Sequence, residues 1–593
     1  MKIIPVPKKI TVDDGRLDLE NITVAVEAGR DIRLTKAAVV LKGEIEDVCG
    51  KFAKTYAAKG EPTEKSVWIT VCDGGNEGYE LTVSEKGVRI VGNSAAGAFY
   101  GIQSFRQMLK EYGAAVPFCR IEDEPDFSER GFYHDITRGR VPTLKKMKEI
   151  AEQLSYFKIN SLQIYVEDAF DLFEFDGIIK KTECMTAAEM MELDDYCYDH
   201  FIELVPSLST FGHLYRLLQS DKYRHLCEYE NWEPYQIFWV EKMAHHTIDV
   251  SNPESIEVVK SMIDQYVPLF RSNKFNICCD ETFDLCKGRN KGKDEGDEYF
   301  GFVTQIIEHV RSYGKQVQMW GDVVLAHMEK AKKYLAGVTM LNWNYTKEAK
   351  EENVKAIAET GLEQIVCPGT SSWNRFIEEL DRSVGNISGL AAYGKKYGAT
   401  GILNTNWGDF GNICSWNCEM YGMVFGAEKG WNPAGEVGED FEMAASLLLY
   451  GCKDANVVKL IYDMGMCERT CDWMGFVYWY SANTKEGRKT ELAVDRPKAK
   501  ENIARIGEIK TELQGLLCDG DVKDDLLLAA RAIKLMNKTV LMIVGEEGYG
   551  DRTALKAEWA EWFCEYREAW MRDDKESQVD AVGEFLDSLT TLF

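Results

Sequence analysis

The chain of 593 residues is poor in positive charge, because 70 lysines and arginines face 97 aspartates and glutamates and leave a net charge of −27. Nucleic acids and anionic membrane surfaces are bound by basic faces, so neither is expected as a partner. No run approaches the ~20 apolar residues of a membrane span, and residues 1–9 lack the apolar core of a signal peptide. These absences predict a cytoplasmic protein, or a secreted one if a leader segment was trimmed.

Histidine is also scarce, with 8 residues, and the 17 cysteines follow no spacing typical of a zinc site or a disulfide framework. Cys414 and Cys418, for example, form a C-x₃-C pair that has no matching second pair. The adjacent His245 and His246 have no third ligand at a predicted strand end. We therefore expect free thiols, no metal and no cofactor.

Residues 1–125 are predicted to form a small supporting α+β domain. Alternating strands at Tyr79–Val83 and Val88–Val91 precede a helix that Asn93 or Ser94 caps. No cluster of catalytic residue types stands out in this segment.

Residues 126–428 alternate short apolar runs with stretches of helical periodicity, the first of which starts after Pro142 and Thr143. Eight such runs with helices between them are what a (β/α)₈ TIM barrel needs, so an α/β barrel is predicted here. The runs are Gly131–Thr137, Ser161–Val166, Ile202–Leu208, Phe275–Asp280, Gln316–Gly321, Thr339–Asn344, Gln364–Gly369 and Gly401–Gly408.

Residues 429–593 show only helical periodicity and are predicted to form a C-terminal helical region. Four aromatic residues are spaced three or four apart near its end, a pattern typical of a buried helix face rather than a ligand platform. They are Trp559, Trp562, Tyr566 and Trp570.

Carboxylates and tryptophans gather at the ends of the eight runs, where a barrel places its chemistry. Trp320, Trp343 and Trp407 lie near the ends of the fifth, sixth and eighth runs, and Trp373 follows the seventh. Several tryptophans on one rim favour a pocket that stacks on the apolar face of a sugar ring over ordinary core packing.

Asp280 and Glu281 are adjacent at the end of the fourth run. Adjacent residues of a strand point to opposite faces, so both reach one ligand only where the strand ends. Two carboxylates this close are expected to repel and to raise one pKa, as a general acid requires near neutral pH. Ordinary retaining glycosidases hold two carboxyl groups about 5–5.5 Å apart, whereas an adjacent pair suits a reaction whose substrate supplies the nucleophile.

The segment Phe275–Thr282, which contains this pair, resembles the catalytic signature of glycoside hydrolase family 20, the β-N-acetylhexosaminidases. The resemblance covers about residues 1–425 and keeps its order along the chain. Its other segments are Gly78–Leu109, Arg130–Phe132, Asp135–Arg138, Phe211–His213 and Trp407–Asp409.

The resemblance implies a retaining, substrate-assisted mechanism in which the 2-acetamido oxygen of the sugar attacks its own anomeric carbon. Asp280 would hold the acetamido nitrogen, and Glu281 would act first as general acid and then as base. Arg138 would bind the O3 and O4 hydroxyls, and Asp409 the O4 or O6 hydroxyl, while the tryptophans line the pocket. The supporting residues would be Glu167, Asp168 and His213.

Two departures from the family pattern affect this picture. The second run and the residues after it, Gln163–Asp168, lack the usual His-x-His. The family's Tyr-x-Asp after strand seven, whose tyrosine holds the acetamido oxygen, is replaced by Trp373, Asn374 and Arg375. Asn374 or Tyr345 could take over that contact, and the choice between GlcNAc and GalNAc stays open.

The predicted function is an exo-acting glycoside hydrolase that releases terminal β-linked N-acetylhexosamine from an oligosaccharide or glycoconjugate. The missing Tyr-x-Asp keeps one alternative, a non-catalytic amino-sugar-binding protein on a retired glycosidase barrel. A metal-dependent barrel hydrolase is a third class, against which the scarce histidines speak. The aromatic-rich stretch 209–252 could be a lid or a packed subdomain, and a homodimer stays open.

Overall fold

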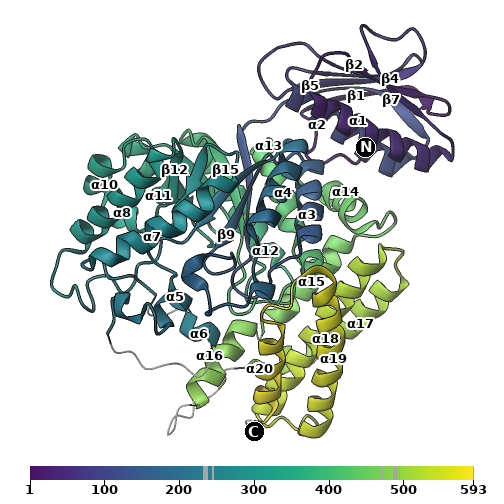
Figure 1. Cartoon of the computed structure of the whole chain (residues 1–593). Helices are drawn as coiled ribbons and strands as arrows, with labels where there is room; N and C mark the ends of the chain where they lie inside the picture. Colours follow the sequence, from purple (N-terminus) through teal and green to yellow (C-terminus); the bar gives the residue numbers. More distant parts are fainter. Residues whose placement is uncertain (231–237, 243–245, 471, 485–491, 493, 592–593) are drawn as a thin grey trace.

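The computed structural model describes residues 1–230, 238–242, 246–470, 472–484, 492 and 494–591. An N-terminal sheet, a central barrel and a C-terminal set of helices follow one another along the chain (Figure 1). His245 and part of the 209–252 stretch, residues 231–237 and 243–245, lie outside the described residues. No described helix has the length and hydropathy needed to cross a membrane.

The N-terminal sheet has seven strands in the order β1-β7-β5-β6-β4-β2-β3. The predicted hairpin is present as β5 and β6, which pair antiparallel from Tyr79 opposite Gly92 to Ser84 opposite Gly87. Ser94, one of the two predicted caps, accepts the Gly97 N–H at the start of helix α2 (Ala95–Tyr112). The remaining elements are β1 (Lys9–Asp18), β2 (Thr23–Glu27), α1 (Ile32–Cys49), β3 (Lys54–Ala58), β4 (Ser66–Val71), β5 (Tyr79–Ser84), β6 (Gly87–Gly92) and β7 (Ala115–Asp123).

The central segment closes into the predicted eight-stranded parallel barrel, so the fold prediction is confirmed. Each strand begins and ends near its predicted apolar run except the fourth, which ends earlier than predicted. In barrel order from the chain's first strand, the strands are β8 (Glu129–Asp135), β9 (Ser161–Val166), β10 (Glu203–Leu208), β11 (Lys274–Asn276), β12 (Gln316–Trp320), β13 (Val338–Trp343), β14 (Gln364–Cys367) and β15 (Gly401–Asn406).

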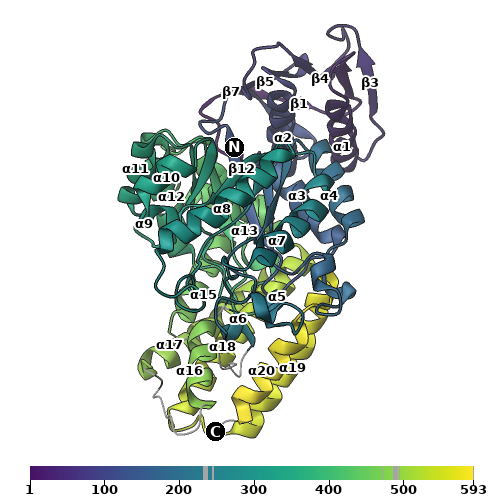
Figure 2. The same cartoon turned by 60° about the vertical axis from the view of Figure 1, so that its left-hand side comes forward.

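Helices surround this barrel and bury its outer face (Figure 2). In α3, for example, the Thr143 hydroxyl accepts the Lys146 N–H, and Met147, Ile150 and Leu154 pack inward at helical spacing. The longer helices of this layer are α3 (Leu144–Tyr156), α4 (Ala187–Asp199), α7 (Pro253–Tyr266), α8 (Glu295–Ser312), α11 (Glu351–Thr360), α12 (Leu380–Lys396) and α13 (Met420–Trp431).

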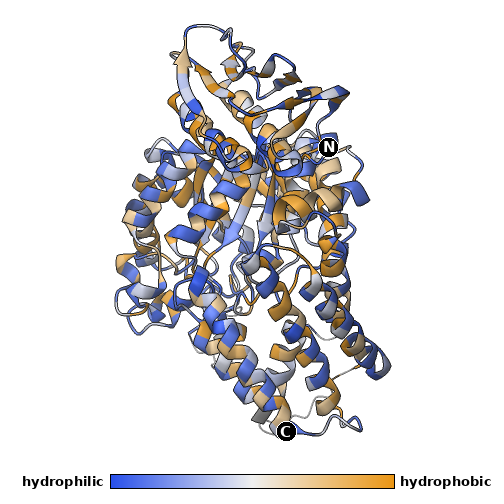
Figure 3. Ribbon diagram, turned by 90° about the vertical axis from the view of Figure 1, so that its right-hand side faces the viewer, coloured by the Kyte–Doolittle hydropathy of each residue, from blue (hydrophilic) through white to orange (hydrophobic). Residues whose placement is uncertain are grey.

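The C-terminal helical region carries its apolar residues inward (Figure 3). The aromatic stripe of α19 is buried, as predicted, with Trp562 and Trp570 at 0% exposure. The helices are α14 (Glu439–Tyr450), α15 (Val457–Glu468), α16 (Trp473–Thr484), α17 (Arg496–Gly515), α18 (Gly520–Ile543), α19 (Arg552–Asp573) and α20 (Val579–Thr591).

These C-terminal helices lie against the carboxyl end of the barrel. Arg140, in the loop after β8, donates to the Tyr566 hydroxyl and the Asn412 carbonyl and pairs with the Asp574 carboxylate. The Trp473 indole of α16 donates to the carbonyl of Phe410, which follows β15. The helical region therefore supports the loops on which a barrel carries its chemistry.

Candidate functional site

A cup of aromatic side chains fills the carboxyl end of the barrel. Trp320 and Trp407 are buried with ring centroids 5.7 Å apart, and Tyr133 lies 5.0 Å from each. Three half-buried rings continue the cup, because Tyr345 stacks on Trp343 at 5.0 Å and meets Trp373 at 5.2 Å. The four tryptophans singled out in the sequence thus belong to one aromatic cluster.

Arg138 lies beside this cup with its charge surrounded by carboxylates. Its guanidinium is 3.0 Å from the Asp409 carboxylate and 3.3 Å from those of Asp135 and Glu167. The same guanidinium lies 5.0 Å from the centres of the Tyr165 and Trp407 rings. The loops after β8, β9 and β15 therefore converge on one buried cation.

Backbone hydrogen bonds to Asp135 hold two of these loops together. Its carboxylate accepts the N–H groups of Thr137 and Arg138 from its own loop and that of Gly408 from the loop after β15. Asp409 follows directly, with a pKa raised to about 6 by burial, against the lowering effect of Arg138. The position of the Arg138–Asp409 pair is thus fixed by the neighbouring backbone.

Lys242 is a second buried cation of the site, and sequence reasoning did not identify it. Its ammonium is 2.9 Å from Glu167 and 3.4 Å from Asp168 and donates to the Thr137 carbonyl. Burial alone would raise the pKa of Glu167, but Lys242 and Arg138 hold it at about 2. Lys242 lies in the long stretch after β10, where neither a motif nor a strand end marks it.

The prediction that the fourth strand runs to Asp280 is wrong. Strand β11 ends at Asn276, whose side chain accepts the Cys278 N–H. Cys278, Cys279 and Glu281 then adopt left-handed backbone angles, with φ of 58°, 63° and 47°. Such angles are costly for residues with a Cβ, so the surrounding structure must impose them. Asp280 and Glu281 therefore lie on a strained turn beyond the strand.

Two neighbouring residues fit tightly against this turn. A Cβ at Gly212 would lie 2.5 Å from the Asp280 carbonyl oxygen, so only glycine permits the approach of the Phe211–His213 segment. The Glu281 N–H donates to the Asp322 carboxylate at 2.9 Å. Asp322 follows β12 in the sequence, and its contact with the turn could not be read from spacing alone.

His213 lies between the two adjacent carboxylates. Its Nε2 is 3.4 Å from Asp280 and 3.3 Å from Glu281, while its Nδ1 is 3.4 Å from the Arg138 guanidinium and 3.7 Å from Glu167. Burial would lower the pKa of this imidazole, but the adjacent carboxylates raise it to about 10. His213 is therefore charged near neutral pH.

The pKa argument made from the adjacent pair is wrong in its assignment. Burial raises the pKa of Glu281, but the hydrogen bond and the charge of His213 outweigh it and leave the pKa lowered. Beside this pair, the pKa of Asp322 is raised to about 7, because this carboxyl is buried and faces the charges of Asp280 and Glu281. Repulsion among carboxylates is present, but it acts on a residue distant in sequence.

The two substitutes considered for the family's tyrosine differ in their surroundings. The Tyr345 hydroxyl lies inside the cup and accepts the Trp407 indole N–H at 2.7 Å. Asn374 has a left-handed φ of 65°, and its amide nitrogen is 3.7 Å from the Met474 sulfur of α16. The Asp168 carboxylate lies 3.5 Å from Arg216 and 3.4 Å from Lys242, and these contacts place it beside the two cations rather than beside Glu281.

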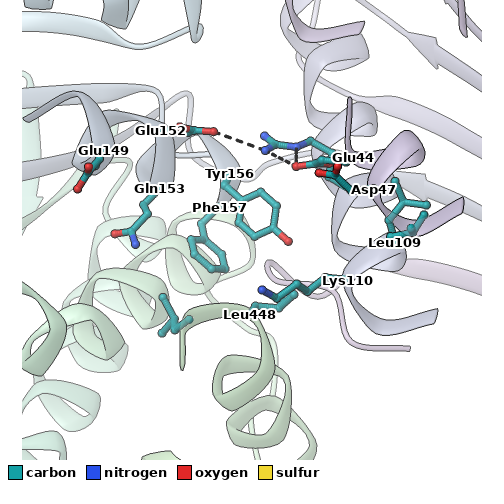
Figure 4. Close-up of a pocket in the computed structure, with 13 residues that line it drawn as sticks. Glu44, Asp47, Leu109, Lys110, Glu149, Glu152, Gln153, Tyr156, Phe157 and Leu448 are labelled. Atoms are coloured by element: carbon teal, nitrogen blue, oxygen red, sulfur yellow. Dashed lines mark hydrogen bonds and ion pairs between the residues drawn. The ribbon is translucent and has the colours of Figure 1, made fainter. Parts of the chain in front are cut away.

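A separate pocket lies between the N-terminal domain and the barrel (Figure 4). It has a volume of about 660 Å³, and Arg106 in its wall pairs with Glu44 and Glu152. None of the residues that line it belongs to the site described above. Within the described ranges, no group of three or more His, Cys, Asp or Glu side chains is arranged to hold a metal ion.

A parallel barrel with tryptophans and carboxylates at its carboxyl end is an arrangement suited to a glycosidase, and comparison with known proteins identifies the family. Residues 1–124 match glycosyl hydrolase family 20, domain 2, and residues 127–386 match the glycosyl hydrolase family 20 catalytic domain. The chain belongs to glycosyl hydrolase family 20, the β-hexosaminidases.

Curated relatives are distant and longer. The chain is similar to the beta-hexosaminidase of Porphyromonas gingivalis, with 24% identity over 410 residues that cover 62% of this chain and 50% of the relative. It is 24% identical to the lacto-N-biosidase of Bifidobacterium bifidum over 306 residues, which cover 45% of this chain and 25% of that protein. The chain thus spans at most about half the length of these two relatives.

Solved structures share the fold. The chitobiase of Flavobacterium johnsoniae aligns with a TM-score of 0.64 and 15% identity over 100% of this chain and 99% of its own. The exo beta-N-acetylglucosaminidase of Vibrio harveyi, solved in complex with N-acetylglucosamine, aligns with a TM-score of 0.60 and 17% identity over 76% of each chain.

Proposed function

We propose that this protein is an exo-acting β-N-acetylhexosaminidase that releases terminal β-linked GlcNAc, GalNAc or both from a glycan by a retaining, substrate-assisted mechanism. The family and the aromatic cluster at the carboxyl end of the barrel support this function. The observation that carries it is the state of Asp280: the residue is 6% exposed, and its Oδ1 atom has no hydrogen-bond partner among the described residues. A buried acceptor of this kind suits the N–H of a 2-acetamido group.

The site offers polar contacts for the sugar on one side and apolar contacts on the other. Arg138 and Asp409 offer charged donors and acceptors for the sugar hydroxyls, while Trp407 and the half-buried Trp343 and Trp373 pack against the apolar face of the ring. Trp320 is 0% exposed, so it supports Trp407 rather than contacting the sugar. Tyr345 places a hydroxyl among these rings, so we assign it rather than Asn374 to the acetamido oxygen.

In the first step, the acetamido oxygen forms a bond to the anomeric carbon, and the bond from that carbon to the leaving oxygen breaks. Asp280 accepts the acetamido N–H and offsets the positive charge of the oxazolinium ring. Glu281 gives its proton to the leaving oxygen. In the second step, water attacks the anomeric carbon, the ring opens, and Glu281 takes up the proton that the water releases.

The proton that Glu281 delivers is held by the Glu281–His213 pair. In the free protein the pKa of His213 is raised to about 10 and that of Glu281 is lowered, so the proton resides on the imidazole. A bound sugar removes water from Glu281, and loss of solvation favours its neutral form. Substrate binding would thereby move the proton to the carboxylate that needs it.

A panel of aryl glycosides tests this function. We expect hydrolysis of the β-GlcNAc or β-GalNAc glycoside and no hydrolysis of the β-glucoside, because glucose lacks the acetamido nucleophile. Proton NMR should show the β-anomer of the sugar as the first product, as retention requires. Equal rates on the β-glucoside would contradict the mechanism. Tight binding of GlcNAc-thiazoline without any hydrolysis would indicate a sugar-binding protein instead.

A further inference from the structure

Phe283 places an exposed aromatic ring beside the proposed acid. The residue is 51% exposed, although it lies next to the buried residues Thr282 and Asp284. Single exposed apolar side chains are common, so exposure alone carries no meaning. Its importance comes from what fixes the ring in place.

A backbone hydrogen bond ties Phe283 to Glu281, and a ring contact ties it to His246. The Phe283 N–H donates to the Glu281 carbonyl at 2.7 Å, and the Glu281 N–H is in turn held by Asp322. The Phe283 ring centroid lies 5.9 Å from that of His246. The short left-handed turn therefore determines where the ring lies relative to the acid.

His246 links this ring to the rest of the site. Its imidazole stacks on His213 with centroids 4.7 Å apart and an angle of 12°, and its Nδ1 accepts the His213 N–H at 2.9 Å. His213 contacts Arg138 on one side and Glu281 on the other. A row of contacts thus runs from Arg138 through both histidines and ends at Phe283.

We propose that Phe283 is the platform for the leaving group, namely the second sugar ring, to which the released hexosamine is β-linked. The inference rests on the proposed function, in which Glu281 touches the leaving oxygen. The leaving ring must then lie beside Glu281, which contacts His213 through Nε2, whereas the hydroxyl-binding Arg138 contacts Nδ1 on the other side of the imidazole. Phe283 follows Glu281 by two residues on the same turn. A phenyl ring offers no polar atom, so it recognises the apolar face of a pyranose and not a particular hydroxyl pattern.

Two substrates with different leaving groups test this subsite. N,N′-diacetylchitobiose loses a sugar ring, whereas methyl β-N-acetylglucosaminide loses only methanol. In Phe283→Ala we expect kcat/KM to fall about tenfold on the disaccharide, the size of one lost stacking contact, and to change less than twofold on the methyl glycoside. Phe283→Tyr keeps the ring and should behave like the unaltered enzyme on both.

Phe52 supplies the matched control, because it is a phenylalanine 96% exposed on the N-terminal domain. Phe52→Ala should leave both substrates unaffected. Equal losses on both substrates in Phe283→Ala would show that the ring only positions the acid, and unchanged rates on both would show no contact; either result overturns the proposal. Failure of the unaltered enzyme to cleave any β-N-acetylhexosaminide would instead overturn the proposed function, and this subsite with it.

Discussion

Two acidic regions meet at the mouth of the barrel and are neutralised in different ways. In the first, the Arg138 cluster, the carboxylates of Asp135, Glu167 and Asp409 surround Arg138, and Lys242 pairs with Glu167. Burial opposes the charge of Arg138, but Tyr165 and the surrounding carboxylates hold the pKa of its guanidinium above its usual range, so it stays charged at physiological pH. This cluster therefore has a fixed charge pattern, which suits the recognition of neutral hydroxyl groups.

The second region, the acid turn, comprises Asp280, Glu281 and Asp322, and its cation is His213. Burial would lower the pKa of His213, but its carboxylate neighbours raise it to about 10, so the imidazole is charged in the free protein and lies 3.3 Å from Glu281. Under the proposed function, the region that binds hydroxyl groups is balanced by a guanidinium and an ammonium group, and the region that transfers a proton is balanced by an imidazole in contact with Glu281. Each of the following predictions alters one side of that contrast.

The largest effect is expected from Glu281→Gln, which removes the proton donor but preserves the shape of the acid turn. Loss of a general acid typically costs a factor of about 10²–10⁴, so kcat on an aryl β-N-acetylglucosaminide should fall by that amount while KM changes little. Steady-state kinetics measure both values. Glu295→Gln, at an exposed position in the first turn of α8, is the control and should leave kcat unchanged. A wild-type rate in Glu281→Gln would remove the acid turn from the mechanism.

A second prediction concerns the fixed charge of the Arg138 cluster. Arg138→Met leaves three carboxylates without their shared partner, and Arg138 is only 6% exposed. Breaking a buried ion pair costs about 3–5 kcal/mol, so the free energy of unfolding measured in urea should fall by that order. The KM for hexosaminides should also rise, because the hydroxyl contacts are lost.

Arg505 provides a matched control for that substitution. It also has three carboxylate partners, Asp463, Glu508 and Glu512, but its side chain is 35% exposed. Solvent-exposed pairs contribute about 0–1 kcal/mol, so Arg505→Met should change the free energy of unfolding by no more than that. Equal losses in the two variants would mean that burial does not distinguish the Arg138 cluster.

Much of the fold could be predicted from the sequence, because strands and helix caps depend on short segments of the chain. The strand at Ser161–Val166 lies where its apolar run predicts it, and Ser94 caps its helix through a short-range contact. The barrel followed from counting such runs. The end of the fourth strand was missed because the turn at Cys278 and Cys279 is imposed by tertiary contacts, and no propensity predicts left-handed cysteines.

Site residues could be predicted from the sequence where they directly follow a strand. Arg138, Asp280, Glu281 and Asp409 all lie in motifs just beyond strand ends, and the structure brings the first and last of them to 3.0 Å. Lys242 was missed because it reaches Glu167 from the short helix α6 (Phe238–Lys242), in a long stretch of sequence without clear periodicity. The pKa shift was assigned to the wrong residue, since proximity in sequence says nothing about a histidine or an aspartate contributed by another strand.

The smallest of the predicted effects concerns Asp322 and the free energy of unfolding. The acid turn carries three carboxylates, and His213 is its cation. Burial and the charges of Asp280 and Glu281 raise the pKa of Asp322 from 3.8 to about 7. An unfolded Asp322 releases its proton near pH 4, whereas the folded one retains it to about pH 7. The folded state therefore binds more protons in this window, and the free energy of unfolding falls as pH rises through it.

Asp322→Asn should remove that loss, because the amide cannot ionise and its oxygen can still accept the Glu281 N–H. Unfolding in urea at pH 8 should then require about 1–3 kcal/mol more than in the unaltered protein, and the two proteins should agree near pH 4. The exposed Asp294 is the opposite case, since a hydrogen bond from Lys330 lowers its pKa, and Asp294→Asn should not stabilise the protein at any pH. If Asp322→Asn also left the free energy of unfolding unchanged at pH 8, repulsion among the carboxylates of the acid turn would not cost stability. The acid turn would then differ from the Arg138 cluster only in the type of its cation.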